Sequence, residues 1–169
     1  FYQGIPTVNN ILQRIEIEGM RVEIGDEDHT NSTLAHAYLL QGILYGHIAM
    51  LYDRAFLLTE ETDPNEFDFD FTGYESLMDF AISRVEKAIE ICNNNSFTDP
   101  ISMMPDVHFD SESLGRFANS MAARMLAFSA RTGQETANLD WTKIRQFAQN
   151  GITDDFLVGV QDNWRGVVI

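Results

Sequence analysis

The sequence predicts an all-α protein, because five segments carry apolar residues at three- and four-residue spacing and no convincing run of strands is present. The chain has 169 residues, of which 44% are hydrophobic, so it is long enough for one core and short for two ordinary domains. We therefore expect residues 1–169 to form a single helical domain. The order of the helices suggests antiparallel pairs, the second with the third and the fourth with the fifth, as in divergent helical repeats.

The first two predicted helices differ in how much of their surface is apolar. The first spans residues 5–18 and ends at Gly19. Its inward face consists of Ile5, Val8, Leu12 and Ile15. The second spans residues 32–57 and is apolar nearly all round, so neighbouring helices must cover several of its sides. Since a glycine inside a helix costs about 1 kcal/mol of propensity, Gly42 and Gly46 indicate that neighbouring helices approach closely.

Residues 34–52 are the one candidate for a membrane span, since they lack formal charges and have about the length that a bilayer requires. Gln41 and His47 lie near the centre of this stretch and no basic cluster flanks it, which favours a buried helix of a soluble protein. The opening "FYQGIPTVNNILQRI" has neither a basic region nor a continuous apolar region, so we expect no signal peptide here.

The third predicted helix, residues 73–92, is the cleanest amphipathic segment of the chain. We expect Thr72 to be its N-cap and to form a capping box with Glu75. Its inward face consists of Leu77, Phe80, Ala81, Val85, Ala88, Ile89 and Cys92. Because Cys92 lies on this face and is the single cysteine, it is expected to be a small buried hydrophobic side chain.

The stretch that leads into this helix, "FDFDFTGYESLMDF" at residues 67–80, allows other interpretations. Its strict alternation of Phe and Asp would suit a strand. Asp68, Asp70 and Thr72 also match positions one, three and five of an EF-hand calcium loop, with Asp79 at position twelve in place of the usual Glu. The capping box instead makes the stretch a loop between antiparallel helices, with the aspartates toward water and these side chains toward the helices: Phe67, Phe69 and Phe71.

The fourth and fifth predicted helices span residues 111–131 and 141–150. We expect Gly133 to end the fourth, and Asp140 to be the N-cap of the fifth. The predicted inward face of the fourth consists of Leu114, Phe117, Met121, Met125 and Phe128. That of the fifth consists of Trp141, Ile144 and Ala148.

The charge of the chain restricts its partners. It has 11 basic and 26 acidic residues, a formal net charge of −15. A phosphate backbone or an anionic lipid surface would be repelled by this charge, so we expect no nucleic acid as a partner.

Several helix patterns resemble those of SusD/RagB-like nutrient-binding proteins. "AHAYLLQGILYGHIAMLYDRAFLL" resembles the signature helix of that family, with its alanine- and glycine-spaced aromatic residues and a Tyr-Asp corner. "YESLMDFAISRVEKAIEI" resembles the following family helix. "SLGRFANSMAARMLAFSARTG" and "DWTKIRQFAQNGIT" resemble the next pair, and the opening resembles the early "Tyr…Asn…Ile-Leu" helix. The resemblance covers most of the chain, but only the tetratricopeptide-like part of a family whose members are usually much longer.

This resemblance implies a tetratricopeptide-like, SusD-like array of antiparallel helix pairs and a non-catalytic nutrient-binding function. Such proteins lie on the cell-surface side of the bacterial outer membrane, hold an oligosaccharide or other nutrient, and cover a SusC-like TonB-dependent transporter. They meet the membrane through a lipid anchor, which here would lie outside this segment. We therefore expect the chain to be a fragment of a larger SusD-like protein.

One segment combines the side chains that sugar binding needs, an aromatic face and hydrogen-bonding groups. In "QDNWRG", Trp164 could stack on a sugar ring, and the hydrogen bonds would come from Asp162, Asn163 and Arg165. The alternative is that Trp164 covers the end of the last helix pair, as buried aromatic residues often do.

Catalysis has less support in the sequence. A glycosidase needs two carboxylates facing each other, and no pair is marked by its spacing. No nucleophilic triad or phosphate-binding loop is found, and His36 and His47 are about 16 Å apart along a helix, too far to share a metal. We expect packing or hydrogen-bonding roles for both histidines, no cofactor and no enzyme activity. The alternatives to nutrient binding are a helical-repeat scaffold for protein–protein interaction and, less favoured, a carbohydrate-active enzyme.

Overall fold

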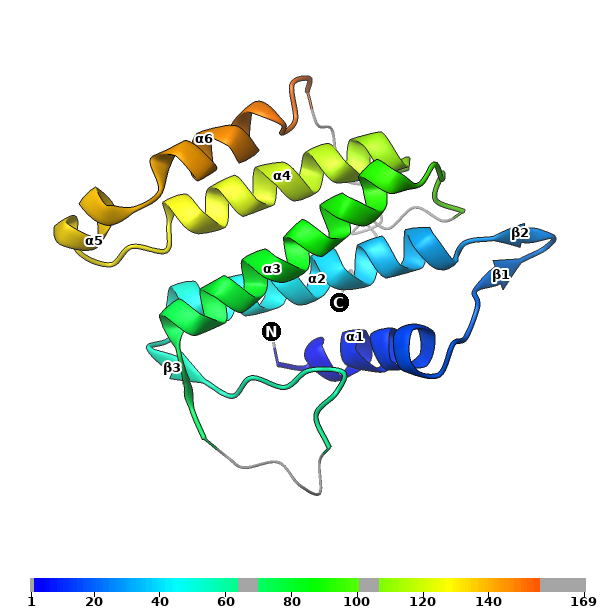
Figure 1. The fold of residues 1–169 in the computed structure, drawn as a ribbon, viewed down its shortest axis with the longest axis horizontal. Helices are drawn as coiled ribbons and strands as arrows, with labels where there is room; N and C mark the ends of the chain where they lie inside the picture. The colour runs from blue at the N-terminus through cyan, green and yellow to red at the C-terminus, as the bar shows by residue number, and fades with distance from the viewer. Residues whose placement is uncertain (1, 64–69, 101–106, 156–169) are drawn as a thin grey trace, which may run out of the picture.

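The structure is a computed structural model that describes residues 2–63, 70–100 and 107–155. Helices dominate it, as predicted, and neighbouring helices run in opposite directions (Figure 1). Along the chain the helical elements are α1 (Ile5–Leu12), the π-helical turn η1 (Gln13–Ile17), α2 (Thr30–Leu51), α3 (Tyr74–Asn94), α4 (Ser111–Ala127), α5 (Gly133–Asn138) and α6 (Trp141–Gln149). Two short antiparallel ladders join β1 (Glu23–Ile24) to β2 (Glu27–Asp28) and β3 (Arg54–Ala55) to β4 (Thr72–Gly73).

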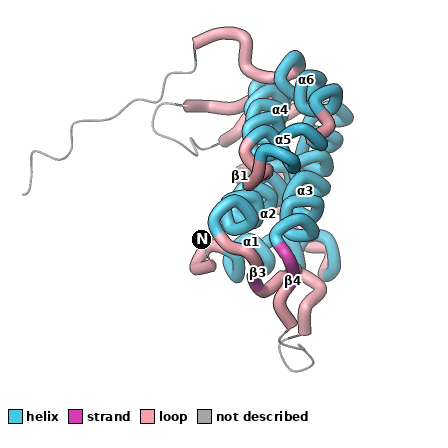
Figure 2. Tube along the Cα trace, turned by 90° about the vertical axis from the view of Figure 1, so that its left-hand side faces the viewer, coloured by secondary structure: helices cyan, strands magenta, loops and turns pink. Residues whose placement is uncertain are grey.

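The helices are stacked in chain order, with α1 on α2, α2 on α3, α3 on α4 and α4 on α6. Figure 2 shows this stack, from α1 at the bottom to α6 at the top. The predicted neighbours, α2 with α3 and α4 with α6, are therefore in contact. One hydrophobic cluster includes side chains from α1, α2, α3, α4 and α6.

Helix α2 has the central place that its apolar sequence predicts, because it contacts α1, α3 and α4. Gly42 lets α3 approach closely, since a Cβ atom there would lie 2.6 Å from Val85 Cγ2. Within the described residues this helix alone is long and apolar enough to cross a membrane. Of the 18-residue apolar stretch that meets this criterion, 61% is buried inside the protein. This burial favours the prediction of a core helix over that of a membrane span.

A buried polar cluster explains why Gln41 is tolerated in this core. The side chain is fully buried, and its Nε2 donates to Asn9 Oδ1 at 2.8 Å and to Glu60 Oε2 at 3.0 Å. Glu60 in turn pairs with Arg84 at 3.0 Å. These contacts connect α1, α2, α3 and the segment after β3, and they satisfy the amide nitrogen of Gln41. Two buried atoms of the cluster, Gln41 Oε1 and Arg84 Nε, have no hydrogen-bond partner among the described residues.

The sequence predicted the end of the first helix correctly and the end of the second incorrectly. Gly19 ends the first helix with a φ of 72°, as predicted, because glycine adopts left-handed angles without strain. The second ends at Leu51 rather than at residue 57, because Tyr52 is extended and the chain continues into β3. The guanidinium of Arg131, distant in sequence, donates to the carbonyl oxygens of Ala49 and Tyr52 and thereby caps this helix end.

The predicted capping box at the start of α3 is wrong. Its N-cap is Gly73, without a side-chain cap, and Thr72 belongs to β4, where it faces Ala55. The helix start is tied instead to the segment before β3, because the Tyr74 amide donates to the carbonyl oxygen of Asp53 at 3.0 Å. Phe71 is 57% exposed rather than turned fully toward the helices, and its ring stacks on Phe56 at 4.3 Å.

Gly133 does not end the fourth helix, which stops at Ala127; it begins the short helix α5, which the sequence prediction missed. Thr132 is the N-cap of α5, and its Oγ1 accepts a hydrogen bond from the Glu135 amide at 3.2 Å. A Thr followed three residues later by Glu is a helix-start signal, and here it outweighs the glycine as a stop.

The inward faces of the last two long helices also differ from the prediction. On α4, Leu114 and Met125 are buried as expected, but Phe128 is 69% exposed. On α6, Ile144 is buried together with Phe147, whereas Trp141 is 51% exposed and Ala148 is exposed. The N-cap prediction for α6 is confirmed, since Asp140 accepts a hydrogen bond from the Lys143 amide at 2.9 Å.

Candidate functional site

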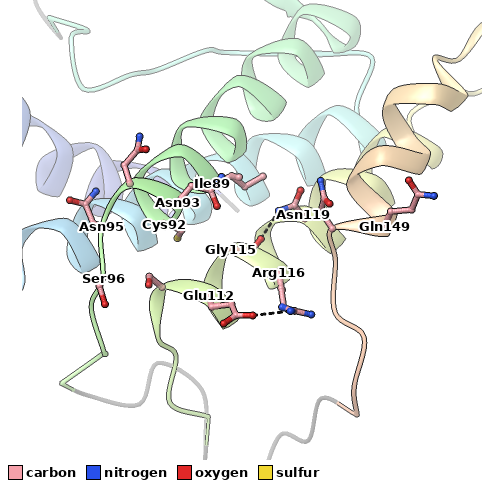
Figure 3. A pocket seen from close by; sticks show the side chains of 13 residues that line it. Ile89, Cys92, Asn93, Asn95, Ser96, Glu112, Gly115, Arg116, Asn119 and Gln149 are labelled. Carbon is pink, nitrogen blue, oxygen red and sulfur yellow. Dashed lines mark hydrogen bonds and ion pairs between the residues drawn. The ribbon is translucent and has the colours of Figure 1, made fainter.

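A polar cleft of about 800 Å³ opens where α3 ends, α4 begins and α6 ends. Figure 3 shows its side chains coming from all three helices. Most of them carry amide, hydroxyl or charged groups. The lining residues are Ile89, Cys92, Asn93, Asn94, Asn95, Ser96, Ser111, Glu112, Gly115, Arg116, Asn119, Gln149 and Asn150.

The first wall of the cleft is the asparagine run that ends α3. Asn95 is the C-cap, and its Nδ2 donates to the carbonyl oxygen of Ile91 at 2.8 Å, which satisfies one of the free carbonyls at the helix end. Asn31, at the start of α2, donates to Asn95 Oδ1 at 2.8 Å. Asn93 and Asn94 precede this cap and are exposed, so their amides are available to a ligand.

The floor of the cleft is the first half of α4. Gly115 allows this helix to approach α3, because a Cβ atom at that position would lie 3.3 Å from Cys92 Cβ. One turn later Asn119 is buried, and its Nδ2 donates to the carbonyl oxygen of Gly115 at 2.8 Å. The charged side chains beside this floor, Glu112 and Arg116, pair with each other at 2.8 Å.

The position of α4 is set by a complete capping box at its N-terminus. Asp110 accepts a hydrogen bond from the Ser113 amide at 2.8 Å, and Ser113 Oγ accepts one from the Asp110 amide at 3.0 Å. The bonds from the Ser113 side chain and backbone hold the pKa of the Asp110 carboxyl below its usual value. This cap was not predicted, although "DSES" has the pattern of an N-cap with a polar residue at the third helical position.

The second wall is the end of α6. The turn that follows α6 is hydrogen-bonded to α4. Ser120 Oγ accepts a hydrogen bond from the Ile152 amide at 2.9 Å, and Arg116 donates to Thr153 Oγ1 at 2.9 Å. Gly151 allows the contact with α4, because a Cβ atom there would lie 2.5 Å from Ser120 Oγ. Gln149 and Asn150 therefore line the cleft from its α6 side.

The cleft is suited to reversible binding of a hydroxyl-rich ligand. Six of its lining residues carry planar amides, groups that have two N–H donors and one carbonyl acceptor. Asn95 and Asn119 already use part of this capacity within the protein, and the other four are Asn93, Asn94, Gln149 and Asn150. A hydroxyl group is both a donor and an acceptor, so it matches an amide surface better than a purely anionic or cationic one. Among the described lining residues, Glu112 is the single carboxylate, and Arg116 already neutralises it.

Cys92 is buried, as the sequence predicts, and it lies at the floor of the cleft. Its thiol has a low reactivity there. Burial raises the pKa of its thiol to about 12, and the negative charge of Asp99 contributes in the same direction. A thiol that stays protonated is a poor nucleophile, so Cys92 is part of the packing between α3 and α4.

The structure describes only some of the residues that the sequence nominated for binding. The sugar-binding segment, Asp162 to Arg165, lies outside the described residues, as does Asp68 of the calcium hypothesis. Thr72 lies in β4 and Asp79 lies in the second turn of α3, so helix begins at the seventh position of the supposed calcium loop. Within the described residues no group of three or more His, Cys, Asp or Glu side chains could hold a metal ion. Calcium binding stays a prediction.

Both histidines form hydrogen bonds, as predicted. His36 Nε2 lies 2.5 Å from Asp99 Oδ2, and His47 Nδ1 lies 2.7 Å from the carbonyl oxygen of Ile43. The cleft residues themselves were missed, because the run "NNNS" was interpreted only as turn-forming sequence. The concentration of amides at the end of a helix could have indicated a binding site. The other residues of the cleft, on α4 and α6, are distant from this run in the chain, so the sequence did not connect them with it.

Comparison of the chain with protein-family models, with curated proteins and with solved structures gave no match. The resemblance to SusD/RagB-like proteins therefore stays a prediction from the helix patterns. Function must be inferred from the geometry of the chain itself.

Proposed function

We propose that this chain binds an oligosaccharide, without cleaving it, in the cleft between α3, α4 and α6. The observation that carries the proposal is the set of six amide side chains around one cleft of about 800 Å³. This volume is within the range of ordinary ligand sites, which is roughly 300–1,000 Å³. Planar amides arranged on opposite walls can hydrogen-bond sugar hydroxyls along both edges of a ring.

The same cleft favours binding over hydrolysis. Glycoside hydrolysis uses two carboxyl groups on opposite sides of the scissile bond. The described lining residues offer one carboxylate, Glu112, and it forms an ion pair with Arg116. This composition supports a non-catalytic role.

In its wider setting, we propose that the helices are the tetratricopeptide-like part of a SusD-like protein at the bacterial cell surface. The order of stacking, in which each long helix packs on the one before it, supports a repeat-like array. A SusC-like TonB-dependent transporter would be the protein partner, and the lipid anchor would lie outside this segment. These statements rest on the sequence resemblance.

The test is calorimetry against a panel of oligosaccharides, with variants that remove cleft amides. Asn93 and Gln149 are exposed on opposite walls, so Asn93→Ala and Gln149→Ala should leave the fold intact. A protein that carries both substitutions loses two hydrogen bonds of about 1 kcal/mol each, so its binding of the best glycan should be about 30-fold weaker. Gln134→Ala, which removes an exposed amide on α5 outside the cleft, is the matched control and should bind normally.

Other outcomes would replace the proposal. If no glycan binds while a protein other than a transporter is retained in pull-down, the chain is a helical-repeat scaffold. Release of reducing sugar would instead show an enzyme. If Trp164→Ala weakens glycan binding and the amide variants do not, the site is the segment predicted from sequence rather than the cleft.

A further inference from the structure

A second hollow, of about 220 Å³, adjoins the amide cleft between α3 and α6. The two cavities share three lining residues, which are Ile89 on α3, Asn119 on α4 and Asn150 at the end of α6. The hollow adds four side chains of its own: Glu86, Lys143, Gln146 and Phe147. Because the same residues of three helices line both cavities, the cleft and the hollow form one groove.

This groove runs along α3 and α6, away from the ends of the two helices. Glu86 and Lys143 precede Asn93 and Gln149 of the cleft by about two helical turns, which is roughly 10 Å at the usual rise. Lys143 Nζ lies 2.8 Å from Glu86 Oε1, so an ion pair joins α6 to α3 at this end. The groove is therefore wide at the cleft and bridged by a salt bridge at its far end.

Asn119 lies where the two cavities meet, and its side chain has an acceptor to offer. The residue is 8% exposed, and its Nδ2 donates to the carbonyl oxygen of Gly115 at 2.8 Å. A carbonyl only accepts, so the amide nitrogen must face Gly115 and the amide oxygen points away from that bond (Figure 3). Within the described part of the chain Asn119 Oδ1 has no hydrogen-bond partner, and it is not among the unpartnered atoms that are sealed from solvent. A ligand hydroxyl at the junction could therefore donate to it.

We propose that the hollow is a further sugar subsite of the amide cleft, and that the groove takes a neutral oligosaccharide of trisaccharide length. This subsite rests on the proposed binding of a glycan in the cleft. At the roughly 30 Å³ that a water molecule occupies, the cleft holds on the order of 27 non-hydrogen atoms, about a disaccharide. On the same scale the hollow holds on the order of seven, about one further sugar ring.

The side chains of the hollow suit an uncharged sugar ring. Ile89 and Phe147 supply apolar surface for its C–H face, and the exposed amide of Gln146 can hydrogen-bond its hydroxyl groups. Glu86 is already paired with Lys143, so the hollow adds no free carboxylate for hydrolysis. The net charge of −15 disfavours an acidic sugar, which leaves a neutral one as the better ligand.

The experiment is calorimetry with the di-, tri- and tetrasaccharides of four neutral series, the malto-, cello-, manno- and xylo-oligosaccharides. In a series that binds, the trisaccharide should bind at least about fivefold more tightly than the disaccharide, which is the effect of one net hydrogen bond. The tetrasaccharide gains no further hydrogen bond beyond the Lys143–Glu86 pair, so its affinity should rise by less than about twofold more. Equal affinity of disaccharide and trisaccharide would remove the subsite and leave the cleft, whereas no binding in any series would remove both. A fourth unit that adds as much as the third would refute the trisaccharide length.

Two variants that each remove one exposed amide separate the hollow from the cleft. Gln146→Ala acts in the hollow and should lower the ratio of trisaccharide to disaccharide affinity about fivefold. Asn93→Ala acts in the cleft and should weaken both ligands, which keeps the ratio. Gln134→Ala, on α5 outside both cavities, is the control and should change neither affinity. A ratio that survives in Gln146→Ala, or that falls equally in Asn93→Ala, would overturn the assignment of the hollow.

Discussion

Replacing Gly42 by alanine tests the close approach of α2 to the backbone of α3. A Cβ atom at Gly42 would lie 2.6 Å from Val85 Cγ2 and 2.7 Å from the carbonyl oxygen of Ala81. The Val85 methyl could move by a rotamer change, but the Ala81 oxygen belongs to the backbone of α3. Relief therefore requires the two helices to separate.

Two opposing effects set the size of the change. Overpacking of a core costs about 1–3 kcal/mol, and the backbone contact places Gly42→Ala near the upper end. Alanine in a helix is favoured over glycine by about 1 kcal/mol. The net expectation is a loss of about 2 kcal/mol in the free energy of unfolding. For a protein of this size that corresponds to a fall in Tm of roughly 4–8 °C.

Thermal and urea unfolding, followed by circular dichroism, provide the measurement. Gly133→Ala is the matched control, because nothing lies within 4 Å of a Cβ atom there, and it should change stability by less than about 0.5 kcal/mol. Gly46→Ala meets only the side chain of Met125, so shortening that side chain should partly rescue it. A Gly42→Ala protein as stable as the native one would show that α2 and α3 do not approach as described.

Three further predictions concern the helix ends and the cysteine. Asp110→Ala should destabilise the protein by about 1 kcal/mol at neutral pH. Because the folded-state pKa of Asp110 is lowered, its contribution is fully present above the unfolded pKa of about 3.9 and is lost as pH falls through the folded value. Urea titrations at several pH values should therefore show a smaller difference between variant and native protein in acid, and a constant difference would contradict this. Cys92, whose thiol pKa is about 12, should react with a thiol reagent at pH 8 only after unfolding, and rapid labelling of the native protein would refute its burial. Arg131→Ala should cost about 2–3 kcal/mol in thermal unfolding, since the guanidinium caps α2 and lies 3.9 Å from the Tyr74 ring centroid. Arg131→Lys should not restore it, because one ammonium cannot replace the planar set of donors.

How much could be predicted from sequence depended on how local the deciding interaction is. Gly19 and Asp140 were identified correctly as a helix stop and an N-cap, because both act within a few residues of their own position. Thr72 was misassigned, although its local pattern suits a cap, because Ala55 pairs with it across the β3–β4 ladder. The predicted inward face of α6 was wrong at Trp141. Helix α6 packs on α4 in a way that leaves this side chain 51% exposed.

The candidate sites were harder to predict than the helices. Asn93 and Gln149 lie on opposite walls of one cleft but far apart in the chain, and neither has a motif around it. His36 and Asp99 are separated by 63 residues and still lie 2.5 Å apart. Periodicity places such residues on a helix face or at a helix end, but it does not tell which faces meet.

The sequence by itself determined the helical class, the approximate helix positions, the burial of Cys92 and the close packing at Gly42, because these follow from spacing and side-chain size within single segments. Only the tertiary structure decided where α2 ends, how α3 begins, and which polar groups share a cleft. These features depend on contacts between segments that are distant in the chain, such as Arg131 on the end of α2. Where the backbone groups at a helix end are satisfied by a distant segment, as at the end of α2, the neighbouring residues do not reveal the partner.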